Sequence, residues 1–489
     1  MSAFSMLKKL AGESLVYGLS GIISRFVGVF LIPIYTRFFV PADYGIISLV
    51  TNLFGLLTFL AILGLDDGIH RWYYETEDED DRKKTLNTFL WSYFALAAFF
   101  SCSLAIFHNF FAAQILKEPQ AATPVLIAAC NFPLMISVVF TSNVLRIQRR
   151  AVYTSVFLLT ISLITIILNV VFVVFLRAGL VSIFYAQLIT SSIAAIWTLI
   201  LFKDLISPKH FDWQRWKEMF SFSYPLIPAN LSYWVINLSG VYFIQSFADT
   251  REVGLYQVGA AIATAMALLT GAFQMAWGPF AISIHKQTGA QQFYALALDL
   301  YIGIASLAAV LITLFSSEVL IILTTESYFD GYLVAGILAF NYLVIGLGYI
   351  SMIGANIAKN NKSYGIASLI AACLMVLLNL ILVPVYGKEG AAISTLVSQI
   401  VIPIVVFRQT QKFYPIPYNF GKAFLIFLTG LIAGFGVLSL IKEAGFGFYP
   451  GIAVKTVTGL VYLTFLFWIL KPGIYSSRDI TGEFFQAES

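Results

Sequence analysis

The sequence predicts an all-α polytopic membrane protein with about fourteen transmembrane helices. The chain is 59% hydrophobic and only 11% charged, whereas soluble domains carry about 25% charged residues. Apolar runs recur along the chain with short breaks, and many reach the ~20 residues that a helix needs to cross a ~30 Å hydrocarbon core. Lysine and arginine gather in alternate loops, which is the positive-inside pattern of membrane proteins.

The apolar runs define the predicted spans. No stretch between them is long enough to form a soluble domain. The predicted helices lie at 14–39, 44–66, 85–108, 121–145, 153–176, 180–202, 219–247, 253–280, 293–316, 331–357, 364–386, 389–408, 420–441 and 449–470.

The distribution of basic residues predicts the orientation. With the amino terminus inside, the inner loops hold 21 of the 29 lysines and arginines and the outer loops hold six, while Arg25 and Lys455 lie within spans. An odd number of spans would scramble this split. We therefore expect both termini to be cytoplasmic.

The chain repeats itself at an offset of about 209 residues. ADYGIISLV at 42–50 matches REVGLYQVG at 251–259, and Asn169 corresponds to Asn379. Six helices per copy is an even number, so both copies should have the same orientation, related by an axis along the membrane normal. The predicted division is an N-lobe at 1–202, a cytoplasmic linker at 203–218, a C-lobe at 219–412, and two further helices with a cytoplasmic tail at 413–489.

Arg25 lies near the middle of the first predicted span, on the same helix face as Gly21 and Gly28. A cation at mid-membrane costs at least ~2.5–3.5 kcal/mol, so its guanidinium should face protein or water. Two interpretations remain open. Arg25 either pairs with a buried carboxylate for packing, or it faces a cavity that receives an anionic group, and we favour the cavity.

The predicted seventh helix, 219–247, contains a proline and asparagine cluster. Pro225 and Pro228 each remove a backbone hydrogen bond and tend to kink a helix. Asn230 and Asn237 follow on one face, seven residues apart. This helix corresponds in the repeat to the helix of Arg25, so the pair is predicted to line one central cavity.

Further side chains are candidates for the same cavity. Tyr233, Trp234 and Tyr242 lie deep in the seventh helix, where aromatic rings could stack on sugar rings. Arg37 and Arg71 are cationic candidates for an anionic substrate, and Arg71 could guard the inward mouth.

Asp299 lies one to two turns inside the ninth predicted span. It is interpreted either as a carboxylate that reaches the inner face or as a protonatable site for ion coupling.

The sequence contains no motif of an ATPase or hydrolase. A Walker loop, GxSxG and HExxH are all absent. No cofactor, metal or nucleic acid is expected, and an enzyme is the weaker functional class because the outer loops are short.

Two stretches resemble a known family. SRFVGVFLIPIYTRFFVPADYGI (24–46) and GLDDGIHRWYYE (64–75) are similar to the polysaccharide-biosynthesis flippases, the O-antigen and exopolysaccharide repeat-unit translocases of the multidrug/oligosaccharidyl-lipid/polysaccharide exporter superfamily. SRFVG is also similar to helix 1 of the lipid II flippases, which implies that Arg25 contacts a pyrophosphate. Family members often carry Asp-Arg in helix 7, where this chain has Gly240-Val241.

The resemblance implies a multi-pass protein of the plasma or inner membrane. Its substrate would be an undecaprenyl-pyrophosphate-linked oligosaccharide, moved from the inner to the outer leaflet by alternating access. A proton or sodium counter-ion, a polysaccharide polymerase and a chain-length regulator are candidate partners, and a monomer is expected. The alternatives are a multidrug or cation antiporter of the same fold, which should carry an acidic helix 1, and a membrane glycan polymerase or ligase.

Overall fold

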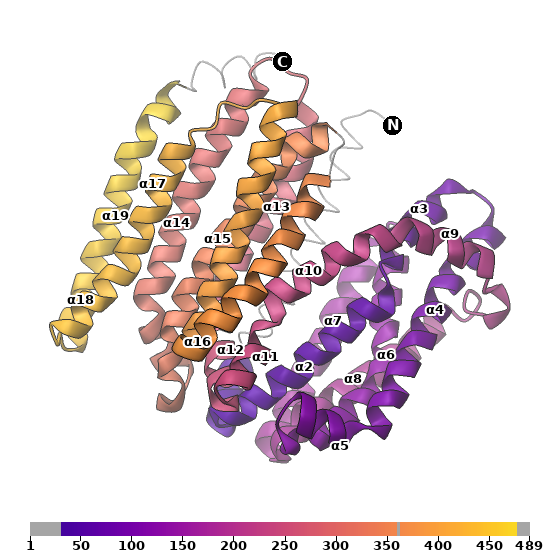
Figure 1. Cartoon of the computed structure of the whole chain (residues 1–489). Coiled ribbons are helices and arrows are strands. Elements are labelled where there is room, and N and C mark those ends of the chain that lie inside the picture. The colour runs from indigo at the N-terminus through magenta and orange to yellow at the C-terminus, as the bar shows by residue number, and fades with distance from the viewer. Residues whose placement is uncertain (1–30, 359–361, 477–489) are drawn as a thin grey trace. The chain divides into compact units, whose positions relative to one another are not determined.

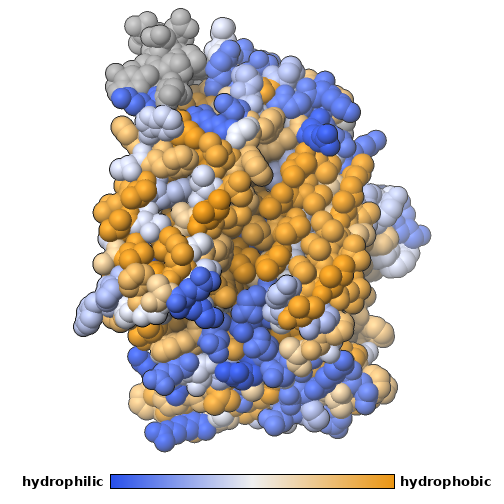
Figure 2. Space-filling view, turned by 60° about the vertical axis from the view of Figure 1, so that its left-hand side comes forward, coloured by the Kyte–Doolittle hydropathy of each residue, from blue (hydrophilic) through white to orange (hydrophobic). Residues whose placement is uncertain are grey.

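The computed structural model describes residues 31–358 and 362–476, and every regular element in these ranges is helical. Within them, eleven helices are long and apolar enough to cross a membrane. The surface in Figure 2 has the distribution of hydrophobic residues expected of a membrane protein. Hydrophobic residues cover much of the helical flanks in view, and hydrophilic residues gather toward their two ends. The predicted all-α membrane class is therefore confirmed, while the count of fourteen spans and the cytoplasmic termini stay predictions.

The chain forms two compact units, the first ending at Gly254 and the second beginning at Leu255. This boundary falls within α12 (Thr250–Ala263). The four-part division drawn from the sequence stays a prediction.

The first unit begins, in its described part, with a helix over residues 31–38. In it, α6 packs against α4 and α8, and α7 packs beside α8. Its further helices are α2 (Pro41–Ile62), α3 (Leu65–Glu75), α4 (Glu79–Ile106), α5 (His108–Phe110), α6 (Ala122–Ile147), α7 (Ala151–Val170), α8 (Ser182–Leu201), α9 (Trp213–Ser223), α10 (Ile227–Leu238) and α11 (Gly240–Phe247).

The polar connection between α8 and α9 is fastened to α4. Asn87 donates to the Leu205 carbonyl at 2.8 Å and accepts from the Ser207 backbone at 2.8 Å. Arg215 of α9 pairs with Asp81 of α4 at 2.6 Å. The connection is therefore an ordered part of the first unit.

The second unit is built around α15, which packs against α13, α14 and α16 (Figure 1). Its helices are α13 (Ala265–Ile284), α14 (Ala290–Leu323), α15 (Tyr332–Ile357), α16 (Lys362–Phe413), α17 (Phe420–Leu431), α18 (Val437–Glu443) and α19 (Phe448–Ser476). The long α16 contains a break at Gly387, whose φ of 52° and ψ of −129° are non-helical. Glycine tolerates this conformation. Because these angles interrupt the helix, α16 is two helices, close to the predicted 364–386 and 389–408.

Helices α17 and α19 run beside α14 (Figure 1) and are joined to it by two ion pairs. Lys422 of α17 contacts Asp299 at 2.7 Å, and Lys455 of α19 contacts Glu318 at 2.7 Å. Each charge is largely removed from solvent, so each needs its partner to offset the cost of desolvation. These pairs fix how the last helices dock on the second unit.

Candidate functional site

The predicted seventh span is broken into three helices. Helix α9 ends at Ser223, a 3-10 turn covers Tyr224–Leu226, and α10 starts at Ile227. Pro225 lies in the turn and Pro228 in the first turn of α10, because proline has no backbone N–H to continue a preceding helix. A second break at Ser239 separates α10 from α11.

One face of α10 and α11 is fixed against α2. The Trp234 indole N–H donates to the Asn52 carbonyl at 3.4 Å, and the Tyr242 hydroxyl donates to the Leu49 carbonyl at 3.0 Å. The two rings lie 5.8 Å apart. Trp234 is only 9% exposed, so it and Tyr242 mainly position α10 and α11 on α2.

The neighbouring face of α10 is more open. Tyr233 is 54% exposed and meets Phe59 of α2 edge to face, with ring centroids 6.4 Å apart. Asn230 and Asn237 are partly exposed, and the Asn237 side-chain NH2 donates to the Tyr233 carbonyl at 2.9 Å. At spacings of three and four residues, Asn230, Tyr233 and Asn237 share one side of the helix. We call these three residues the amide-aromatic face of α10.

Arg37 and Arg71, the other two arginines predicted to contact the substrate, lie at opposite ends of α2. Arg37 is exposed in the helix that precedes α2, and Arg71 is exposed in α3, which follows it. Helix α2 has 22 residues and is therefore about 33 Å long. The structure thus does not bring Arg37 and Arg71 to one anionic group.

Arg71 also has a local role. Its guanidinium lies 5.2 Å from the Trp72 ring centroid and 4.9 Å from that of Phe222. Such cation–π contacts stabilise by about 0.5–1 kcal/mol at exposed sites. They hold α3 beside the end of α9. Arg25 lies outside the described residues, so its surroundings stay a prediction.

Asp299 is placed on α14 in the ion pair with Lys422. The Asp299 side chain is 15% exposed and that of Lys422 is 13% exposed. A carboxylate that holds an ammonium group at 2.7 Å must break this pair before it can bind another cation. Lys422 was not singled out from the sequence because it follows Asp299 by 123 residues, and its spacing carries no signal.

Elsewhere in the described ranges, no group of three or more histidine, cysteine, aspartate or glutamate side chains is arranged to hold a metal ion.

Comparison with solved structures identifies the fold. A lipid II flippase MurJ in an inward closed conformation superimposes with a TM-score of 0.72 at 15% identity, covering 93% of this chain and 99% of that one. An inward-facing multidrug resistance transporter of the MATE family of the MOP superfamily gives 0.63 at 15% identity, covering 79% and 94%. A MATE transporter in a straight conformation gives 0.55 at 16% identity, covering 83% and 95%. At these identities the likeness is one of fold.

The family is shown by sequence. No curated protein matches the chain. The family model described as "Polysaccharide biosynthesis protein" matches residues 10–285, which is more than half of the 489 residues. The match begins before the predicted span of Arg25 and ends just after α13. Together with the transporter fold, it shows that this chain is a multi-pass membrane protein belonging to the polysaccharide biosynthesis protein family.

Proposed function

We propose that this protein is a flippase that moves an undecaprenyl-pyrophosphate-linked oligosaccharide repeat unit from the inner to the outer leaflet of the plasma membrane. Its product would supply the synthesis of an O-antigen, exopolysaccharide or capsule. The observation that carries the proposal is the family match over residues 10–285. The fold likeness to a lipid II flippase over 93% of the chain supports it.

The proposed substrate has three chemically different parts. A pyrophosphate in a low-dielectric cavity needs a cation, and the forked guanidinium of Arg25 offers two parallel donors to phosphate oxygens. The sugars need amide and aromatic partners, and the amide-aromatic face of α10 offers both. The polyprenyl tail can remain in the bilayer.

The proposed movement is alternating access by two lobes around one binding site. With an inside-negative potential, each net negative charge carried outward gains ~2.3 kcal/mol per 100 mV. The Asp299–Lys422 ion pair supports a structural role for Asp299 in place of ion coupling. The movement is therefore proposed without a coupling role for Asp299.

The proposal is tested in a deletion strain complemented with Arg25→Ala. We expect lipid-linked oligosaccharide to accumulate on the inner leaflet and surface polysaccharide to be lost, at the wild-type amount of protein in the membrane. Arg146→Ala is the matched control, because Arg146 is an exposed arginine in the last turn of α6. Normal surface polysaccharide in the Arg25→Ala strain would remove Arg25 from the mechanism.

A second candidate is a multidrug or cation antiporter, which the likeness to MATE transporters favours. A cavity for organic cations should carry carboxylates, whereas the first span carries Arg25. Efflux of cationic dyes separates the two functions, because we expect none above the background of the deletion strain.

A further inference from the structure

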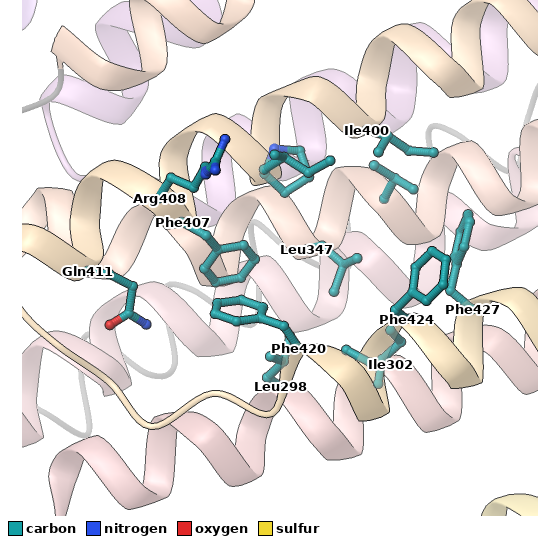
Figure 3. A pocket seen from close by; sticks show the side chains of 14 residues that line it. Leu298, Ile302, Leu347, Ile400, Phe407, Arg408, Gln411, Phe420, Phe424 and Phe427 are labelled. Atoms are coloured by element: carbon teal, nitrogen blue, oxygen red, sulfur yellow. The ribbon is translucent and has the colours of Figure 1, made fainter.

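The second unit contains a pocket of about 620 Å³ between α14, α15, α16 and α17 (Figure 3). This volume is within the ~300–1,000 Å³ range of small-molecule pockets. Its walls include none of the residues assigned above to the substrate. The inference that follows therefore stands apart from the proposed flippase function.

The body of the pocket is apolar. Leu298, Leu347 and Phe424 reach into it from three different helices (Figure 3). Along α16 its lining residues run from Ile400 to Gln411, eleven residue steps or about 16 Å of helix. The pocket is thus elongated, with room for several carbons of an extended chain.

One end of the pocket is polar. Arg408 and Gln411 are the polar side chains among its lining residues, and both lie at the same end (Figure 3). The Gln411 amide is hydrogen-bonded within the protein. It donates to the Ile416 carbonyl at 2.8 Å and accepts from the Ile416 backbone N–H at 2.9 Å. Arg408 is exposed, and its guanidinium has no hydrogen bond or ion pair with any residue that the structure describes. The Arg408 guanidinium is therefore available to bind an anionic group at this end of the pocket.

The polar end is built from aromatic side chains that hold the α16–α17 connection in place. Phe407, Tyr418 and Phe420 form a triangle with centroid distances of 5.0, 5.1 and 5.6 Å. Burial raises the pKa of the Tyr418 hydroxyl, so Tyr418 adds no negative charge to this end of the pocket.

Two of the apolar side chains that line the pocket are themselves exposed at the surface. Phe424 is 66% exposed and Ile404 is 50% exposed. In a membrane protein such residues contact hydrocarbon tails. An apolar pocket does not take up water readily. A lipid chain that enters it from the bilayer therefore has no bound water to displace.

We propose that this pocket binds an anionic phospholipid, with one acyl chain between α14 and α17 and the phosphate at Arg408. The pattern of a long apolar body with one cation at its end is complementary to an anionic amphiphile. Arg408 lies on the side predicted to be cytoplasmic, where anionic lipids attract basic residues at the membrane surface by about 1 kcal/mol each.

The test uses the full-length protein reconstituted in nanodiscs that contain equal amounts of phosphatidylglycerol and phosphatidylcholine. After extraction in mild detergent, native mass spectrometry counts the lipids retained. We expect the wild type to keep one phosphatidylglycerol in preference to phosphatidylcholine. Arg408→Gln should lower this preference about ten-fold or more, the size of one lost hydrogen bond to a charged group. Leu347→Trp, which fills the pocket, should lower retention of both lipids.

Arg146→Gln is the matched control and should keep the wild-type preference, because Arg146 belongs to the first unit and does not line the pocket. If Leu347→Trp does not fold, Ile404→Trp fills the pocket from its exposed side. Equal retention of the two lipids by the wild type, or an unchanged preference in Arg408→Gln, would overturn the proposal. Displacement of phosphatidylglycerol by an equal amount of undecaprenyl phosphate would show that the occupant is the carrier lipid and would also overturn it.

Discussion

Two glycines at equivalent positions of the internal repeat make a reciprocal contact between α2 and α12. A Cβ added at Gly45 would lie 2.0 Å from the carbonyl oxygen of Thr250, the first residue of α12. A Cβ added at Gly254 would lie 1.8 Å from the carbonyl oxygen of Pro41, the first residue of α2. Each glycine is the fifth residue of its helix, so the two helices cross at their first turns.

This geometry sets the size of the expected effect. Ordinary van der Waals contact begins at 3.4 Å and the obstructing atoms are backbone oxygens, so the helix ends must separate by more than 1 Å to admit a methyl group. Forced overpacking of this kind costs about 1–3 kcal/mol. We therefore expect Gly45→Ala and Gly254→Ala each to lower the free energy of unfolding by that amount.

The assay is thermal unfolding of the purified protein in detergent. Gly365→Ala is the control, because Gly365 is helical with nothing within 4 Å of the added Cβ, and alanine improves helix propensity by up to ~1 kcal/mol. Both substitutions widen the same helix crossing. The double variant should therefore lose less free energy of unfolding than the sum of the two single variants. Wild-type unfolding temperatures for Gly45→Ala and Gly254→Ala would refute the close crossing.

Further predictions concern buried polar groups. Asn169 accepts from the Tyr35 hydroxyl at 2.9 Å, so Asn169→Leu should destabilise the protein by about 1–3 kcal/mol in thermal unfolding by leaving that hydroxyl unsatisfied. Its repeat equivalent Asn379 is fully buried, and its amide has no hydrogen-bond partner among the described residues, so Asn379→Leu should leave the unfolding temperature unchanged or raise it, and a loss as large as that of Asn169→Leu would contradict this. Asp299→Asn leaves Lys422 without its partner and should destabilise by several kcal/mol, and adding Lys422→Gln should recover part of the loss. A transport defect in Asp299→Asn without any loss of stability would instead support ion coupling.

The fold class could be predicted from the sequence because bilayer thickness fixes the length of an apolar helix. The sequence also indicated the helix breaks around Pro225 and Gly387. Pro225 lacks a backbone donor, and Gly387 lies between two predicted apolar spans. The repeat at offset 209 pointed to related helices α2 and α12. It did not reveal the glycine contact, which depends on how closely the two helices cross.

The partners of the candidate site residues could not be predicted. Trp234 and Tyr242 donate to backbone carbonyls of α2, and carbonyls have no sequence signature. Lys422 lies at the start of the predicted span 420–441, but nothing in the sequence indicates that it pairs with Asp299 on α14. Long-range pairing of this kind is set by helix packing, on which hydropathy carries no information.

The proposed flippase function is tested most directly by translocation with the purified protein in proteoliposomes. A fluorescent polyprenyl-pyrophosphate oligosaccharide is placed in both leaflets, and a membrane-impermeant quencher reports the fraction that becomes accessible with time. If the protein is a flippase, we expect full quenching with the wild type and quenching of only the outer-leaflet half with Arg25→Ala or with protein-free liposomes. Equal quenching curves for wild-type and protein-free liposomes would contradict it.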